Sequence, residues 1–491
     1  MKHTSVLFPI DLYHDTSYIQ GTKVFLVEEP LYFDRSARRL GSMRFNILKP
    51  VYHRATMRRY MDMLGSRGIS CEYIGLATNW VERVKQYIGK HNSLPVFFDP
   101  VDRYVEQKIS RHFKEYHIIN TPRFICTVED LAEYKGATRQ TSFYKWLRAR
   151  TGILMRGSKP HGGKLTYDTM NREPPYHGIR GDLGVEPTYT ADVYVSEAFR
   201  YVRDNIPAHH MRVWERVDEI RLKFPITRRD AIRRLKWFVA NALDRFGTYE
   251  DVFLKPDGLK PDGKPDNSFV FHAAISPMLN IGLIVPSEVI GYVCEYLESH
   301  PSMIANVEGF VRQILGWREF ARYTYETQSH VYLGKNFFNA SNMLGTAWHT
   351  ASTGMPMTDH CIGKAWRYGY LHHIERLMVC ANHMVLGRID PTQMYRWFME
   401  FALDSYDWVM EYNCYSMASY SDGGNLSSKP YISGSRYLAR MSDYAKDGIW
   451  DVRWDRMFWQ FIASHRKKIK KIPRLAMLIR YAVKYIGGLQ K

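Results

Sequence analysis

Two adjacent histidines, His372 and His373, are the residues of the stretch 369–431 best suited to chemistry. His373 falls at helical spacing with Tyr370 and Leu377, which predicts one imidazole on a mostly apolar helix face. Because a histidine titrates near neutral pH, such a side chain can donate or accept a proton. A histidine on an apolar face is also common as a satisfied core residue, and this feature alone leaves that alternative open.

A carboxylate among aromatic rings follows on the next predicted helix. We expect that helix to begin at Asp390, an N-cap residue, with Pro391 in its first turn. Helical spacing then places Asp404 on one face with Trp397 and Trp408. Such an aromatic stripe is usually core packing, but burying ionisable groups costs free energy unless each is paired. Together the two predicted helices indicate a polar ligand between them.

Composition and charge limit the classes of protein that fit. A chain of 491 residues is too long for one core, and its 45% hydrophobic and 24% charged residues are ordinary for a soluble protein. The net charge of +18 favours an anionic partner, nucleic acid ahead of a membrane surface, with basicity for solubility alone as the alternative. No run of about 18 apolar residues and no signal peptide is visible. We therefore expect no membrane partner and a cytoplasmic, nucleoid-associated protein.

The six cysteines are scattered along the chain, without a Cys-x-x-Cys pair. This arrangement argues against a zinc ribbon and against a disulfide framework. We therefore expect isolated, buried thiols.

The residue pattern divides the chain into three regions. Residues 1–140 alternate short apolar runs with helix-like runs, which predicts an α/β domain with a parallel sheet. Residues 141–210 open on a basic, aromatic helix and then become rich in Gly, Pro and charge, as in an interdomain connection. Residues 211–491 are helical almost throughout, which predicts a large all-α domain. The predicted strands are residues 5–10, 23–27, 95–100 and the neighbourhood of 118–119, and the predicted helices include 46–64, 81–88, 142–150, 228–246, 287–299 and 304–325.

Four stretches of the helical region together resemble DNA photolyases and cryptochromes. Residues 310–320 contain Arg-Gln-x-x-x-Trp-Arg-Glu-Phe, and residues 275–283 resemble that family's Leu-Ser-Pro-x-Leu-Asn-x-Gly-Leu segment. His-His-Ile-Glu-Arg-Leu at 372–377 and Ser-Lys-Pro-Tyr, which begins at Ser428, are similar to the bacterial (6-4) photolyase branch. That branch usually carries an iron–sulfur cluster.

The resemblance implies a light-driven DNA photolyase, a carbon–carbon lyase whose helical domain holds FAD and whose partner is UV-damaged DNA. The damaged bases would be flipped into a pocket beside the flavin, at a cost that damaged pairs partly offset. The electron would come from photoexcited reduced FAD, which the protein positions. A (6-4) lesion needs a proton as well, and the histidine pair therefore favours the (6-4) photoproduct.

The resemblance also assigns residues to these tasks. His373 would donate the proton, with His372 as its supporting neighbour, and Tyr431 and Met417 would line the lesion pocket. The positions that would hold the phosphates, ribityl chain or ring of FAD are Tyr249, Ser276, Gln313 and Arg318. Asp404 and Asn413 would lie near the polar edge of the flavin, and Trp397 would be a ring next to the flavin on the electron route for photoreduction. The basic run Arg466, Lys467, Lys468, Lys470 and Lys471 would contact DNA phosphates, with a solvated face as the alternative.

The chain departs from the iron–sulfur branch at its cysteines. That branch uses one cysteine before the double histidine and three after Ser-Lys-Pro-Tyr, but no cysteine follows Cys414 here. The position that corresponds to the first of these cysteines falls near Met357, with Cys361 close by. One thiol cannot hold a cluster that needs four, so we predict no iron–sulfur cluster and no other metal. Trp450, Trp454 and Trp459 would fill that region as packing.

The N-terminal likeness is weaker. Residues 162–172, which include Asn171, resemble the interdomain segment of the branch, and the region around Arg38 and Arg39 resembles its antenna domain. A ribolumazine-type antenna chromophore would then have polar contacts near Asp11 and Glu28, although acidic residues at strand ends are as often solvated.

Other functions fit the same residues. A cyclobutane pyrimidine dimer photolyase would need no proton donor. A cryptochrome-like flavin photoreceptor would keep FAD and lose lesion-pocket groups, and a nucleic-acid-binding structural protein related to primase helical domains would lack FAD. We expect a monomer.

Overall fold

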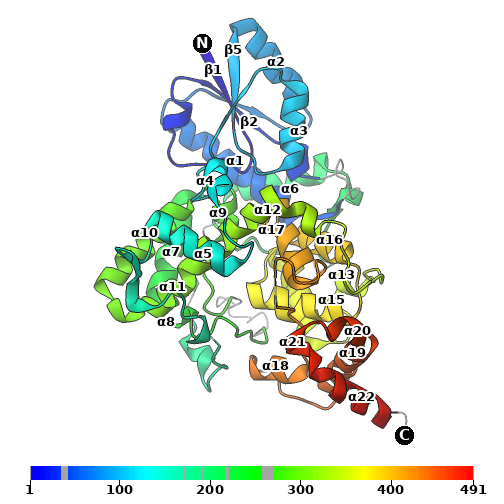
Figure 1. The fold of residues 1–491 in the computed structure, drawn as a ribbon. Coiled ribbons are helices and arrows are strands. Elements are labelled where there is room, and N and C mark those ends of the chain that lie inside the picture. Colours follow the sequence, from blue (N-terminus) through cyan, green and yellow to red (C-terminus); the bar gives the residue numbers. More distant parts are fainter. Residues whose placement is uncertain are drawn as a thin grey trace.

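The computed structural model describes residues 2–34, 43–170, 172–184, 186–189, 192–215, 220–256, 269–427 and 429–489. An α/β domain built by the first part of the chain stands on a larger helical domain built by the rest (Figure 1). Arg38, Arg39, Asn171 and Ser428, which belong to three of the quoted motifs, lie outside the described residues. No helix in the described part of the chain is long and apolar enough to cross a membrane.

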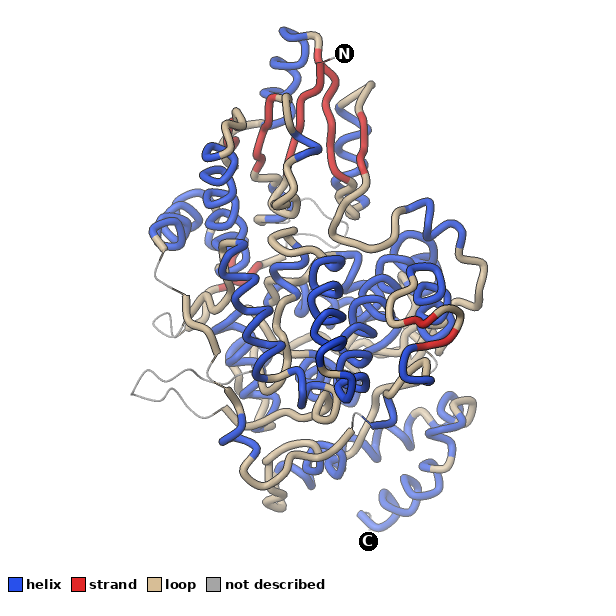
Figure 2. The backbone as a smooth tube through the Cα atoms, turned by 90° about the vertical axis from the view of Figure 1, so that its left-hand side faces the viewer, coloured by secondary structure: helices blue, strands red, loops and turns tan. Residues whose placement is uncertain are grey.

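The α/β domain contains a parallel sheet, as predicted, and the described sheet has five strands. Its order is β4 (Cys71–Ile74), β2 (Lys23–Val27), β1 (Lys2–Leu7), β5 (Ser93–Phe98) and β6 (His117–Ile119). In register, Thr4 of β1 is opposite Lys23 of β2 and Pro95 of β5. The central strands are buried because helices α1 (Leu48–Ser66), α2 (Trp80–His91) and α3 (Arg103–His112) connect and cover them (Figures 1 and 2). The sequence pattern missed β4, a short, partly buried edge strand.

The stretch between the two domains is more structured than an exposed connection. After α4 (Val128–Glu133), helix α5 (Gln140–Thr151) packs against the helical domain, and α6 (Val193–Asn205) packs against α1. The two-residue strands β3 (Phe45–Asn46) and β9 (Met211–Arg212) pair in parallel where the connection ends. A short antiparallel hairpin of β7 (Met155–Arg156) and β8 (Lys159–Pro160) follows α5 and precedes α6 in the sequence. The domain limits at residues 140 and 210 stay a prediction.

The described part of the helical domain contains three π-helical segments: η9 (Gln313–Arg318), η10 (Glu375–Ala381) and η11 (Tyr412–Ala418). Such segments are frequent at functional sites because the extra residue in the turn re-aims the side chains around it. The α-helices of the domain are α7 (Arg228–Asn241), α8 (Leu243–Phe246), α9 (Ser276–Asn280), α10 (Pro286–Ser299), α11 (Ile304–Arg312), α12 (Glu319–Tyr332), α13 (Ala347–Thr350), α14 (Pro356–Tyr368), α15 (Asn382–Leu386), α16 (Pro391–Phe401), α17 (Asp407–Glu411), α18 (Ser435–Arg440), α19 (Trp450–Ser464), α20 (Arg466–Ile469), α21 (Pro473–Ala476) and α22 (Leu478–Leu489).

The two helices predicted around the histidines differ from the structure at their ends. Helical structure begins again only at His373, so Tyr370 and His372 precede the helix on which the pattern placed Tyr370. The N-cap is confirmed, because the Asp390 side chain accepts a hydrogen bond from the backbone N–H of Thr392. The shared face of Trp397, Asp404 and Trp408 is wrong: α16 ends at Phe401, Asp404 lies in a loop, and Trp408 belongs to α17.

Gly369 explains how that loop comes to face the histidines. It ends α14 with a φ of +65°, and a Cβ on this residue would lie 2.8 Å from the Leu403 side chain. Its carbonyl accepts a hydrogen bond of 2.9 Å from the backbone N–H of Leu403. The glycine therefore fastens the loop that carries Asp404 to the turn that carries Tyr370.

Candidate functional site

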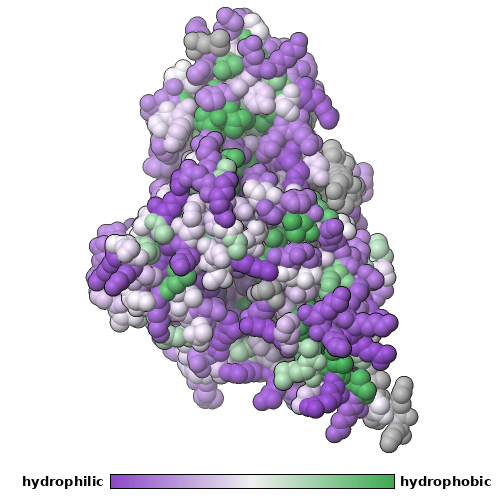
Figure 3. All heavy atoms as spheres, in the orientation of Figure 1, coloured by the Kyte–Doolittle hydropathy of each residue, from purple (hydrophilic) through white to green (hydrophobic). Residues whose placement is uncertain are grey.

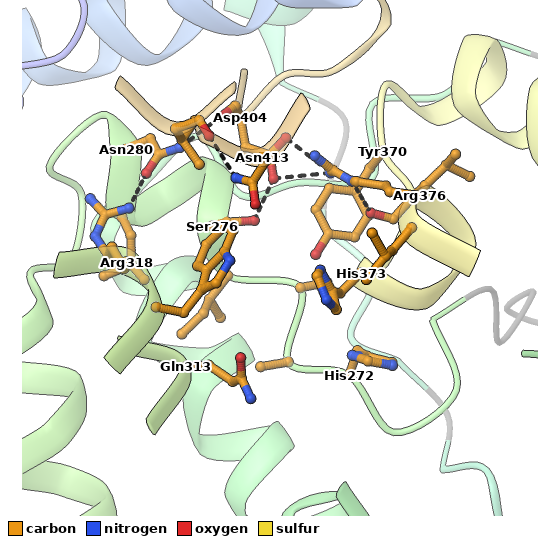
Figure 4. A pocket seen from close by; sticks show the side chains of 18 of the residues that line it. His272, Ser276, Asn280, Gln313, Arg318, Tyr370, His373, Arg376, Asp404 and Asn413 are labelled. Atoms are coloured by element: carbon orange, nitrogen blue, oxygen red, sulfur yellow. Dashed lines mark hydrogen bonds and ion pairs between the residues drawn. The ribbon is translucent and has the colours of Figure 1, made fainter. Parts of the chain in front are cut away.

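A cavity with an empty volume of about 1230 Å³, here called the first cavity, lies among the π-helical segments. Its polar and charged lining comes from five parts of the chain, and ten of these side chains are labelled in Figure 4. Apolar side chains such as Leu279, Phe310 and Ile314 supply most of the remaining wall. A mostly apolar cavity with a few fixed polar groups is the usual form of a small-molecule site.

Asp404 is the centre of the polar network on one side of the first cavity. Its carboxylate accepts a hydrogen bond of 2.6 Å from the Ser276 hydroxyl and is paired with Arg376, whose Nη2 lies 3.0 Å from both oxygens. The backbone carbonyl of Asp404 accepts from the Asn280 amide at 2.8 Å. Figure 4 shows these groups on the same side of the cavity as Asn413. The network therefore holds a carboxylate with its charge compensated at a fixed place.

Arg318 places a buried cation beside this network. One of its guanidinium nitrogens donates to Asn280, and its carbon lies 4.7 Å from the ring centre of Trp408. Its Nε–H is buried and has no hydrogen-bond partner in the described structure. Burial lowers the pKa of Arg318 to about 9, since a desolvated charge is unfavourable without a full counter-ion. An anionic group bound in the first cavity would remove this cost.

Two more polar side chains are fixed by hydrogen bonds at the cavity wall. Gln313 donates to the Glu250 carboxylate at 2.6 Å, and the Asn413 amide donates to the Val409 carbonyl at 2.6 Å. Both residues are in π-helical segments, so their positions depend on the local widening of the helix.

Three histidines gather at the opposite side. His373 lines the cavity, and burial, followed by the nearby Arg376 charge, lowers its pKa to about 4. His272 also lines it, and its pKa is lowered to about 3, first by burial and then by His373 and Lys364. His372 is fully buried behind them, with its ring stacked on that of His272 at 4.3 Å between ring centres. All three imidazoles are therefore neutral at neutral pH.

A second cavity, with an empty volume of about 2140 Å³, shares a wall with the first. The residues common to both are Glu250, Gln313, Trp317, His373, Leu377 and Met417. The second cavity alone is lined by Tyr431 and by the cations Arg139, Arg172, Arg312, Lys429 and Arg474. The face of the molecule drawn in Figure 3 is mainly hydrophilic, with smaller apolar patches.

Most of the predicted ligand-contacting residues line one or both cavities. They are His373, Met417, Ser276, Gln313, Arg318, Asp404 and Asn413 for the first cavity, and His373, Met417, Gln313 and Tyr431 for the second. Tyr249, Trp397 and His372 line neither. The ring of Tyr249 packs 5.9 Å from that of Phe271, and Trp397 lies behind the cavity residue Phe398 at 5.1 Å.

The basic run lies apart from both cavities. Arg466, Lys467, Lys468, Lys470 and Lys471 are in and just after α20, and Lys468 donates to the backbone carbonyl of Phe337. Arg474, which follows in α21, is the residue of this C-terminal segment that reaches the second cavity.

Several cavity residues were missed by the sequence interpretation. Trp317 faces both cavities with its ring 6.2 Å from that of His373, and its Nε1 is buried without a partner in the described structure. Arg376 and Asn280, like Trp317, stand inside the motifs that carried the resemblance, so a closer reading of those motifs would have found them. No sequence pattern indicated His272, because it lies in a non-helical segment that is far in sequence from His372 and His373.

Side chains fill the part of the helical domain in which the iron–sulfur branch is expected to hold its cluster. Trp450 and Trp454 are buried and Trp459 is partly buried, and Met357 occupies the core. Within the described ranges, no three His, Cys, Asp or Glu side chains lie together as metal ligands would. Absence of the cluster stays a prediction.

Asp11 and Glu28 are buried and bonded inside the α/β domain, so neither is solvated. Asp11 accepts from the backbone N–H of Phe8 at 2.9 Å, and Glu28 is paired with Arg54 at 2.5 Å. Neither residue lines the two cavities.

Comparison with known proteins places these features in a family. The family model described as deoxyribodipyrimidine photo-lyase-related protein matches residues 7–213, and that of the FAD binding domain of DNA photolyase matches residues 310–466. A (6-4) photolyase of Agrobacterium fabrum is 32% identical over 345 residues, which cover 68% of this chain and 64% of that protein. The chain thus matches slightly less than two thirds of that relative. An uncharacterized protein of Acanthamoeba polyphaga mimivirus is 37% identical over 191 residues, 35% of this chain and 95% of that protein.

Solved structures share the fold at low sequence identity. A bacterial class III photolyase from Agrobacterium tumefaciens matches with a TM-score of 0.54 and 16% identity, covering 94% of this chain and 87% of that one. A Synechocystis cryptochrome matches with a TM-score of 0.60 and 13% identity, covering 95% and 94%. The α/β and helical domains and the FAD-binding match in the helical domain agree with one another, and the chain therefore belongs to the DNA photolyase and cryptochrome family, consistent with its bacterial (6-4) photolyase branch.

Proposed function

We propose that this protein is a light-driven DNA photolyase that reverses UV-induced pyrimidine lesions, with the (6-4) photoproduct preferred. The observation that carries the proposal is the shared wall of the two cavities, where His373, Trp317 and Met417 face both. A cofactor in the first cavity and a flipped base in the second would meet across these side chains. Electron and proton transfer both require this closeness.

The first cavity fits FAD by its polar atoms as well as by its family match. The unpartnered Nε–H of Arg318 suits a phosphate oxygen, and the apolar wall suits an aromatic ring system. Ser276 and Gln313 would contact the ribityl and phosphate part, and Asp404 and Asn413 the polar edge of the ring. When bound, reduced FAD would supply the electron on excitation.

The second cavity suits a nucleotide that has been flipped out of duplex DNA. Trp317 offers a ring for stacking and an unpartnered N–H, and Tyr431 supplies a further aromatic wall. The cations Arg139, Arg172, Arg312, Lys429 and Arg474 would meet the phosphates around the lesion.

His373 would give the proton that a (6-4) lesion needs. Its imidazole is neutral in the lesion-free protein because burial and Arg376 lower its pKa to about 4. Negative charge brought in by the nucleotide phosphates and by reduced FAD would favour the protonated form, since a nearby opposite charge stabilises an ion. Lesion binding would thus charge the donor at the moment when it is needed.

The test is illumination of the reduced protein with oligonucleotides that carry one (6-4) photoproduct or one cyclobutane dimer, followed by chromatography. We expect repair of the (6-4) lesion, a loss of at least about a hundredfold in His373→Ala with FAD still bound, and no change in His330→Ala, an exposed histidine of α12. Repair of the cyclobutane dimer alone would reassign the lesion. Bound FAD without repair of either lesion would instead favour a cryptochrome-like photoreceptor.

We also propose that the protein works without an iron–sulfur cluster, because Trp450 and Trp454 pack where the cluster ligands of the branch are expected. Iron analysis and a visible spectrum of aerobically purified protein test this. Stoichiometric iron with a cluster absorption would contradict it.

A further inference from the structure

A third cavity lies on the far side of the histidine cluster, with an empty volume of about 1150 Å³. It is lined by residues of α14, including Asp359, His360 and Lys364, together with Lys255 and Glu375. Lys255 is exposed, so this cavity reaches the surface without passing through the other two.

Lys364 and Glu375 form an ion pair at the inner end of the third cavity. The Lys364 Nζ lies 2.7 and 2.8 Å from the two carboxylate oxygens, and both side chains are at most 10% exposed. Burial raises the pKa of Glu375, and Lys364 opposes that shift. An ion pair this deep costs desolvation free energy, and Glu375 places this one beside His372, the neighbour of the proposed proton donor.

Glu375 connects this pair to His372. One carboxylate oxygen accepts from the backbone N–H of His372 at 3.1 Å, and the other lies 3.5 Å from its Nε2. His372 is fully buried, and neither ring nitrogen has a hydrogen-bond partner in the described structure. A buried imidazole without a hydrogen-bond partner is destabilising, because it has lost its water and gained no replacement.

The cluster continues to the first cavity. His372 stacks on His272, whose Nε2 is also buried without a described partner and which lines that cavity. The charged groups that face His372 are Lys364 from α14 and Glu375 and Arg376 from the segment that follows it, and the neighbouring titratable groups are the imidazoles of His272 and His373. Glu375 also faces Tyr444 and Cys361. The Lys364–Glu375 pair, His372 and His272 therefore lie one after another between the third cavity and the first, with His372 Nε2 3.5 Å from Glu375 and its ring stacked on His272.

We propose that Lys364, Glu375 and His372 form a proton relay that carries a proton from the third cavity to His373. This proposal rests on the proposed repair function. Glu375 takes a proton from the Lys364 ammonium and passes it across the 3.5 Å gap to His372 Nε2. The resulting His372 imidazolium gives up its Nδ1 proton to the neighbouring imidazoles, which deliver one to His373, and Lys364 regains a proton from water in the third cavity. Each step breaks one N–H or O–H bond and forms another, and no electrons move. DNA bound over the second cavity would block the path of water to His373 through that cavity. The third cavity would then be the remaining way for a proton to enter from solvent.

Lys364→Arg separates a relay from a merely structural ion pair. Arginine keeps a cation opposite Glu375 but does not release its proton in proteins. For a relay, we expect the yield of (6-4) repair to fall about tenfold at alkaline pH, with the thermal midpoint and FAD content near wild type. The deficit should shrink as the pH is lowered, because a larger fraction of His373 is then already protonated before DNA covers the second cavity. Lys255→Arg, at the mouth of the same cavity, is the matched control and should repair like wild type.

Glu375→Gln is a second variant for the case in which Lys364→Arg disturbs folding. The glutamine amide is close in size and shape to the carboxylate and still offers an oxygen to the backbone N–H of His372. This variant should show the same pH-dependent loss of repair. A soluble, FAD-containing Lys364→Arg or Glu375→Gln protein with wild-type yield at every pH would overturn the relay and leave the repair function standing. A wild-type protein that repairs neither lesion would overturn both.

Discussion

The hydroxyl of Ser276 donates a hydrogen bond of 2.6 Å to the carboxylate of Asp404, which lies 128 residues further along the chain. Ser276 begins α9, whereas Asp404 sits in the loop that Gly369 fastens to the histidine turn. This contact and the Arg376 pair join three separate parts of the helical domain at one carboxylate. The site is therefore built by tertiary contacts across the domain.

Asp404→Asn should destabilise the protein, because it leaves the cation of Arg376 largely buried without its counter-ion. We expect the free energy of unfolding to fall by about 3 kcal/mol. Chemical denaturation of both proteins measures this. Asp244→Asn, whose carboxylate is 47% exposed, should change the free energy of unfolding by less than about 0.5 kcal/mol. Equal stability of Asp404→Asn and wild type would contradict the network.

Arg318→Gln should weaken FAD binding at least tenfold while the protein stays folded. The substitution removes the buried cation that we assign to an FAD phosphate, and a hydrogen bond to a charged group contributes about 1.5–3 kcal/mol. The ratio of flavin to protein after purification and titration of the apoprotein with FAD measure the loss. Arg229→Gln, an exposed position on α7, is the control. Unchanged FAD affinity would remove Arg318 from the cofactor site.

His272 should make the protein sensitive to acid. Its folded pKa of about 3 is below the unfolded value of 6.5, so between these values the unfolded chain binds a proton that the folded protein does not. Stability is then lost as the pH falls below about 6.5. Relative to His272→Gln, the wild type should lose about 2 kcal/mol more between about pH 7 and pH 5. If wild type and His272→Gln lose the same free energy of unfolding between these two pH values, the pKa of His272 is not lowered in the folded protein, and the prediction is wrong.

Trp397→Phe should slow the light-driven reduction of bound FAD at least tenfold. Trp397 lies behind the cavity residue Phe398, and its ring is 5.7 Å from that of Trp348, so the two indoles form a path away from the cavity. Phenylalanine keeps the packing but is much harder to oxidise. The bleaching of oxidised flavin under illumination with an external reductant measures the rate. Trp459→Phe, which lies on neither cavity, should bleach like wild type.

The sequence predicted the fold, and most of its candidate site residues line one of the two cavities, but it did not give the distances between elements. Tyr370 was assigned correctly to the histidine region and wrongly to its helix, because the positive φ of Gly369 ends one helix and three non-helical residues follow. Helical spacing assigned Asp404 to a helix face that does not exist, because α16 ends at Phe401 and Asp404 lies in a loop. The family resemblance assigned the same residue to the cofactor region without using that spacing. His272 and Lys364 could not be found, because only tertiary packing brings them to His372. Periodicity identifies local faces, and it does not give long-range partners.

Arg474→Gln should reduce the salt dependence of binding to lesion DNA more than Lys467→Gln does. Arg474 lines the second cavity, whereas Lys467 belongs to the part of the basic run that lies outside it. Each cation that neutralises a DNA phosphate adds about 0.9 to the slope of log affinity against log salt. Arg474→Gln should therefore lower that slope by about one, measured by fluorescence anisotropy over a range of salt concentrations. If Lys467→Gln lowers the slope as much, the DNA extends over α20 as well, and the whole run contacts phosphates as the sequence suggested.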